Sequence, residues 1–99
     1  MIPKAAQMLG LAMRARKVIS GEELVVQAVR TGQAKLVLLA ADASANTTKK
    51  VRDKCAYYGV PCVTAGDRYA LGHAIGKEGR VTVAVTDGNL ADSILRLLT

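Results

Sequence analysis

The chain has 99 residues, 51% hydrophobic and 22% charged, which describes one folded domain and argues against a disordered chain. Its 14 Lys and Arg residues outnumber 8 Asp and Glu, so the net charge of +6 favours a polyanionic partner such as RNA or DNA. No apolar run approaches the roughly 18 residues of a membrane span, and the N-terminal segment lacks the order of a signal peptide, so we expect a cytoplasmic protein.

Helical and extended patterns alternate along the first half of the chain. Apolar spacing predicts a helix over residues 3–16, a very short strand at 18–19 and a second helix over 20–31. The continuous apolar run at residues 35–41 is typical of a strand covered on both faces. The expected buried stripe of the second helix is Leu24, Val25, Ala28 and Val29.

The second half continues the same alternation. Its expected elements are a helix over 47–58, a strand over 60–64, a helix from Asp67 to Gly76, a strand over 80–86 and a helix over 89–98. No repeat or linker divides the chain, so residues 1–99 form one domain. Alternating helices and strands predict a layered α/β sandwich, although they leave the strand order open.

Residues for catalysis or metal binding are few. Cys55 and Cys62 are too few for a zinc site, and we expect reduced thiols, with a disulfide as the alternative. His73 is the only histidine, and no nucleophile–base pair or glycine-rich phosphate loop can be assembled. We therefore expect no catalytic residue, metal ion or cofactor, with an enzyme that uses Cys55 or His73 as a weaker alternative.

The aromatic content limits how nucleic acid could be bound. Three tyrosines are the only aromatic residues, so stacking of bases on strand aromatics is not expected. Binding would instead use basic side chains, polar edges and the backbone N–H groups of a helix terminus. The basic cluster of the third predicted helix is expected to be a solvated surface, with a phosphate contact as the alternative. Its members are Lys49, Lys50, Arg52 and Lys54.

The start of the second predicted helix carries two glutamates. Ser20 and Glu23 fit a capping box, in which each side chain bonds the backbone N–H of the other residue. Glu22 is not explained by the box, and its carboxylate could accept from a guanine edge. Gly21 is compatible with a tight turn and with close approach of an RNA backbone. Nearby cations that could offset phosphate repulsion are Arg14, Arg16, Lys17 and Arg30.

Four blocks of sequence together carry a family resemblance. They are LGLAMRARKVISGEE (9–23), QAVRTGQAKLVLLAADAS (27–44), KKVRDKCAYYGVP (49–61) and LGHAIGKEGRVTVAV (71–85). In order and spacing they resemble the kink-turn-binding ribosomal-protein family of L-seven-Ae and L-thirty-e, and most closely its small free-standing bacterial members.

The resemblance implies a three-layer α-β-α sandwich with a mixed four-stranded sheet and a non-enzymatic function. It also implies binding of the kink-turn, an RNA motif that sheared G·A pairs bend sharply. In the family, the helix turn after the first strand contacts the G·A guanines, and a loop near the last strand covers extruded nucleotides. On this chain the turn corresponds to Gly21, Glu22, Glu23 and Gln27. The loop corresponds to Lys77, Glu78 and Gly79, followed by Arg80.

Two positions depart from the family pattern. Many relatives have an Asn-Glu pair with a Lys three positions after its Glu, where this chain has Glu23, Leu24 and Gln27. Leu24 cannot accept from a guanine, and Gln27 cannot neutralise a phosphate. We expect a monomer that binds structured RNA such as a kink-turn or ribosomal RNA, and neither a membrane nor a small-molecule substrate. The alternative is a ribosome- or factor-associated protein-interaction module that keeps the fold.

Overall fold

Every helix and strand predicted from the sequence is present in the computed structural model, which describes all residues, 1–99. The boundaries differ from the expected ones by a few residues. The elements are α1 (Pro3–Arg14), β1 (Val18–Ser20), α2 (Glu22–Arg30), β2 (Leu36–Leu39), α3 (Ala45–Tyr58), β3 (Cys62–Thr64), α4 (Arg68–Ala74), β4 (Thr82–Val85) and α5 (Gly88–Leu98). No helix has both the length and the apolar character needed to cross a membrane.

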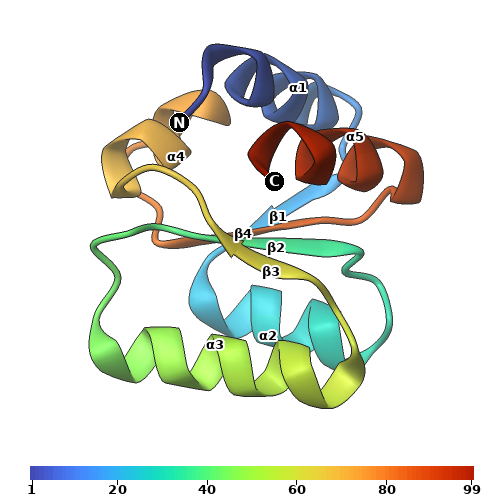
Figure 1. The fold of residues 1–99 in the computed structure, drawn as a ribbon, viewed down its shortest axis with the longest axis vertical. Helices are drawn as coiled ribbons and strands as arrows, with labels where there is room; N and C mark the ends of the chain where they lie inside the picture. Colours follow the sequence, from blue (N-terminus) through green and yellow to red (C-terminus); the bar gives the residue numbers. More distant parts are fainter.

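The four strands form one mixed sheet in the order β1-β4-β2-β3. Strand β4 is antiparallel to both β1 and β2, whereas β2 and β3 are parallel. Helices α1, α4 and α5 cover one face of the sheet and helices α2 and α3 cover the other (Figure 1). The expected three-layer α-β-α sandwich with a mixed four-stranded sheet is therefore confirmed.

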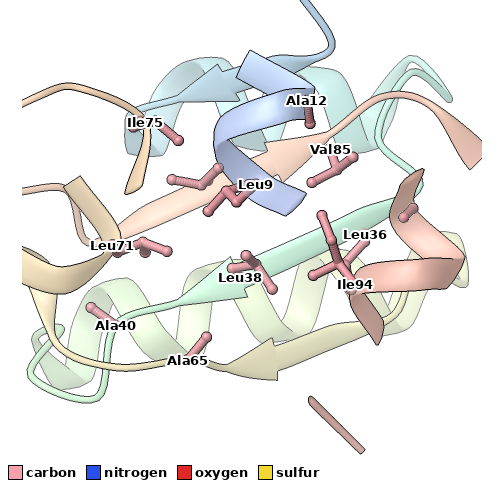
Figure 2. Close-up of a cluster of buried hydrophobic side chains, with 12 residues drawn as sticks. Leu9, Ala12, Leu36, Leu38, Ala40, Ala65, Leu71, Ile75, Val85 and Ile94 are labelled. Carbon is pink, nitrogen blue, oxygen red and sulfur yellow. The ribbon is translucent and has the colours of Figure 1, made fainter. Parts of the chain in front are cut away.

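The continuous apolar run of β2 follows from its position, because its side chains pack into two different cores. Leu36 and Leu38 lie in the core beneath α1, α4 and α5, together with Leu9 (Figure 2). Val37 and Leu39 lie in the core beneath α2 and α3. A strand covered on both faces has no position for a polar residue.

The capping box predicted for Ser20 and Glu23 is wrong. Ser20 is the last residue of β1 and pairs with Val83, and Gly21, with φ 99°, occupies the N-cap position of α2 without a side-chain hydrogen bond. The S-x-x-E pattern is local and does not indicate that the strand extends through Ser20. By contrast, Asp67 caps α4 as predicted, accepting from the Ala70 N–H at 2.8 Å.

The expected buried stripe of α2 is wrong at one position. Leu24 is 58% exposed, and Val26 is buried in its place. Helix α3 packs along the side of α2 that carries Val26, whereas the Leu24 side of the helix has no helix covering it. An exposed leucine therefore lies in the first turns of α2, beside the residues that the resemblance places in RNA contact.

Candidate nucleic-acid interface

One end of the sheet brings together the two halves of the predicted RNA site. The Gly21 N–H donates to the Thr82 carbonyl at 3.2 Å, so the start of α2 lies against the start of β4. The loop at residues 77–80 leads directly into this strand. The Ala40 N–H donates to the Val81 carbonyl at 2.8 Å, which brings the end of β2 to the same end of the sheet.

Helix α2 begins without a side-chain cap, unlike the three helices that follow it. Ser44, Asp67 and Asp87 cap α3, α4 and α5, each accepting from a backbone N–H of the first turn. In α2 no side chain does this, and the Val25 N–H bonds back to the Gly21 carbonyl at 2.9 Å. The N–H groups that precede Val25 in the helix are therefore open to an external acceptor, in the positive end of the helix dipole.

The two glutamates of this turn have different surroundings. Glu22 Oε1 accepts from the Thr47 hydroxyl at 2.6 Å, and Glu22 Oε2 lies 3.2 Å from Lys50 Nζ. The hydrogen bonds from Thr47 and then Lys50 lower the pKa of the Glu22 carboxyl. The Glu23 side chain is exposed and has no such partner. Glu22 thus ties α2 to α3, whereas Glu23 is free to accept from a ligand.

The exposed face of α2 lies between two hollows. One, of about 620 Å³, lies on the α3 side and is lined by Glu23, Gln27 and Thr31 among others. The second, of about 260 Å³, lies on the β1 side and is lined by Leu24 and again by Gln27 and Thr31. Gln27, one turn after Glu23, therefore occupies the ridge between them, accessible from both sides.

The loop that contains Lys77, Glu78 and Gly79 is seated on helix α4. A Cβ atom on Gly72 would lie 1.6 Å from the Glu78 carbonyl oxygen, so only glycine permits this approach. The side chains of Lys77 and Glu78 are exposed. The backbone of the loop is thus fixed by packing, and its charged side chains face outward.

A second set of contacts holds the end of this loop. The Arg80 N–H donates to the Arg68 carbonyl at 3.0 Å, and Arg80 Nη1 donates to the Gly79 carbonyl at 2.8 Å. Arg68 in turn binds Asp42, with Nε 3.0 Å from Oδ2 and its backbone N–H 2.9 Å from Oδ1. Asp42, Arg68 and Arg80 therefore connect the β2–α3 loop, α4 and the covering loop.

Four predicted basic residues lie at the other end of the sheet. The Lys17 carbonyl accepts from Thr86 at 2.8 Å where β1 begins, so Lys17 is about 13 Å along an extended chain from Gly21. Arg14 and Arg16 immediately precede it, and Arg16 has a φ of 60° at the turn after α1. Arg30 lies in the last turn of α2. The predicted site residues are therefore divided between the two ends of the sheet.

Most of the basic cluster on α3 has structural partners. Lys49 pairs with Asp53 at 2.8 Å, and Arg52 donates to the Thr64 hydroxyl at 2.8 Å. Lys50 contacts Glu22, as described above. Arg52 and Lys54 form no ion pair, and Lys54 has no side-chain hydrogen bond either, so Lys54 is the member of the cluster without a partner.

The cysteines and the histidine do not form a catalytic pair. Cys55 and Cys62 are free thiols, and the hydrogen bond with Cys62, together with burial, raises the pKa of the Cys55 thiol. His73 is exposed on α4, in the layer opposite α3. Cys55 and His73 therefore cannot act as a nucleophile–base pair. No three His, Cys, Asp or Glu side chains are grouped as metal ligands.

Comparisons with known proteins agree on the fold and the family. Residues 4–95 match the ribosomal protein L7Ae/L30e/S12e/Gadd45 family. The chain is 58% identical over 91 residues to the RNA-binding protein YlxQ of Bacillus subtilis (strain 168), covering 92% of this chain and 91% of that one. It is 47% identical over 85 residues to the RNA-binding protein YlxQ of Enterococcus faecium, covering 86% of this chain and 82% of that one.

Two solved structures have the same fold. A protein of unknown function from Bacillus halodurans C superposes with a TM-score of 0.94 at 45% identity, over 96% of each chain. The 15.5kD RNA binding protein of Giardia lamblia superposes with a TM-score of 0.83 at 23% identity, over 93% of this chain and 82% of that one. At that identity the second likeness bears on the fold alone.

Proposed function

Because the chain belongs to the ribosomal protein L7Ae/L30e/S12e/Gadd45 family, we propose that it is a non-enzymatic RNA-binding protein that recognises a kink-turn with the N-terminal turn of α2. The names of its bacterial relatives support RNA as the partner. The observation that carries the kink-turn assignment is the uncapped start of α2, with Glu23 exposed on it and the loop at 77–80 beside it.

The open helix start supplies both kinds of hydrogen-bonding group that a sheared G·A pair needs. The Glu23 carboxylate accepts from the N1–H and N2–H₂ groups of a guanine, and the open backbone N–H groups donate to oxygen atoms of the RNA. Gly21 has no side chain to hold the RNA backbone away. Glu22 has a positioning role, because its bonds to Thr47 and Lys50 fix the direction of α2.

Cations near this surface offset the repulsion between Glu23 and the phosphates. Lys77 and Arg80 belong to the covering loop. Its residues Lys77, Glu78 and Gly79 lie over the extruded nucleotides. Arg14, Arg16, Lys17 and Arg30 bind phosphates of the RNA that flanks the bend. Phosphate contacts position the RNA without reading its sequence, so recognition of the G·A pairs depends on the α2 turn.

A gel-shift comparison tests this function. We expect binding to a kink-turn duplex to fall about 10-fold or more when its G·A pairs are replaced by Watson–Crick pairs, the size of one lost bidentate base contact. Glu23→Ala should remove most of this discrimination with only a small loss of melting temperature, since the Glu23 side chain holds no other element and acts only on the helix dipole. Equal affinity of the wild-type chain for both duplexes would show that kink-turn recognition is wrong.

One observation favours a protein-interaction module as a second candidate. Leu24 is 58% exposed and lines the hollow beside Ile19, which gives the start of α2 an apolar contact surface. A pull-down after RNase treatment separates the candidates. A partner held through this surface survives RNase and is lost with Leu24→Ser, whereas a partner held through RNA is released.

A further inference from the structure

We infer that a second RNA contact lies along the groove between α2 and α3 and takes a short unpaired segment that flanks the kink-turn. The inference rests on the RNA binding proposed above and adds a site at the opposite end of α2. Figure 1 shows the two helices side by side and running in the same direction, so the groove follows both axes. None of the family contact positions named above lies on α3.

Two neighbouring hollows form a track along this face, with Arg30 and Tyr58 between them. The groove of about 620 Å³ leads from Glu23 past Lys50 and Lys54 to Arg30 and Tyr58. A second hollow, of about 320 Å³, is also lined by Arg30 and Tyr58 and continues to Lys35. Because Arg30 and Tyr58 line both hollows, these two side chains stand between them, and a ligand that follows the first hollow contacts the pair before it reaches the second.

The charges along this track fit a chain of phosphates. The three ion pairs of the protein are Lys49–Asp53, Lys50–Glu22 and Arg68–Asp42. Arg30, Lys35 and Lys54 therefore have no carboxylate partner, although Lys35 Nζ donates to the Gly32 carbonyl at 3.1 Å. Glu23 is the only acidic residue that lines the track, and it lies at the end where the guanine contact is proposed.

The aromatic residues at the end of α3 fit an unpaired base. The rings of Tyr57 and Tyr58 meet edge to face, with centroids 4.8 Å apart and planes at 78°. Tyr57 is 81% exposed and Tyr58 is 43% exposed, so water contacts both rings in the free protein. A base stacked on such a ring gains contact area whatever its identity, and adjacent cations hold the phosphates on either side.

The length of the track defines the length of the segment. Glu23 to Arg30 spans about 10 Å along the helix axis, which matches about three stacked nucleotides at about 3.4 Å each. An RNA bound at the start of α2 therefore reaches Tyr58 with an unpaired extension of that length. In a continuous duplex the bases are stacked on one another, so they have no free face for the tyrosine rings.

The test measures how much an unpaired extension adds to binding. Fluorescence anisotropy compares a blunt kink-turn duplex with the same duplex carrying four unpaired nucleotides at either end, and the gain is the ratio of the two Kd values. We expect a gain of about 5-fold or more in the wild-type chain, which Tyr58→Ala abolishes and Tyr58→Phe retains. Lys54→Gln should reduce the gain and its dependence on salt.

Tyr69→Ala is the matched control, because Tyr69 is 70% exposed on α4 in the opposite layer. No gain in the wild-type chain, or an equal gain in Tyr58→Ala and Tyr69→Ala, would overturn the inference and leave the groove for a protein partner. The gain can also be measured on the duplex with Watson–Crick pairs. A wild-type chain that keeps the gain but binds both blunt duplexes equally contradicts the kink-turn proposal alone.

Discussion

The two ends of helix α2 differ in how their polar groups are satisfied. At the start, Gly21 is bonded to β4 and Glu22 to α3, so the backbone there is held in one position. At the end, Arg30 and its neighbour Lys54 have no ion pair. Reading a base pair requires groups fixed in space, whereas holding a phosphate requires mainly charge. The first end is suited to specificity and the second to affinity.

The largest effect is expected at Gly72 of α4, where the covering loop packs against the helix. Gly72→Ala places a Cβ 1.6 Å from the Glu78 carbonyl, so the covering loop must move. We expect a loss of about 1–3 kcal/mol, or about 4–8 °C in Tm per kcal/mol, and weaker kink-turn binding. Thermal denaturation followed by circular dichroism measures the first effect, and anisotropy the second.

Gly88→Ala is the control for this prediction, because a Cβ at the start of α5 meets no atom within 4 Å. Equal melting temperatures for the two variants would show that the loop adapts to the methyl group. The covering loop would then not be a rigid part of the RNA-binding surface.

A gain-of-function variant tests the contacts at the start of α2. The double variant Leu24→Glu, Gln27→Lys supplies the acceptor and the cation that many relatives have at these exposed positions. We expect about 10-fold tighter binding to the kink-turn duplex and a salt slope steeper by about 0.7–0.9, the contribution of one added phosphate contact. Anisotropy titrations at several salt concentrations between about 50 and 200 mM measure both the affinity and the salt slope.

The single variants divide the two contributions. Leu24→Glu should improve the preference for G·A pairs over Watson–Crick pairs, and Gln27→Lys should strengthen binding to both duplexes. If neither change strengthens binding, α2 does not face the RNA as proposed. Leu24 then belongs to the protein-binding alternative.

The sequence predicted the elements well because each has a local cause. The strand at β2 follows from an apolar run buried on both faces, and α3 ends at Gly59, whose φ is 70°. The start of α2 was predicted less well, because its contacts are not local. Glu22 bonds to Thr47, which is 25 residues away, and Ser20 pairs with Val83 across the sheet. No spacing within the helix indicates either partner.

Smaller losses of RNA affinity are expected when basic residues without an ion pair are substituted. Lys17→Ala and Arg30→Ala should each reduce the salt slope by about one unit, with equal losses for the kink-turn and the Watson–Crick duplex. Lys49→Ala is the control, since Lys49 is already paired with Asp53. A loss confined to the kink-turn duplex would mean that these residues take part in reading the G·A pairs, and the division between the two ends would be wrong.

The smallest effect concerns the tie between α2 and α3. Bonds to Thr47 and Lys50 lower the pKa of Glu22 in the folded chain, below its ordinary value of 4.5. A carboxyl with a lowered folded pKa stabilises the protein above the unfolded value, and this contribution is lost as the pH falls through the folded value. The melting temperature of the wild-type chain should therefore exceed that of Glu22→Gln at neutral pH, and the difference should disappear in acid.

Glu78→Gln provides the comparison, because Glu78 is exposed and forms no ion pair. A difference between wild-type and Glu22→Gln that stays constant with pH would mean that shape, not charge, ties the helices. If the tie is electrostatic, Glu22→Gln should also weaken G·A discrimination while leaving the salt slope for the blunt duplex unchanged, because Glu22 orients the α2 turn without touching a phosphate. Those two readouts separate a positioning residue from a contact residue on the same turn of helix.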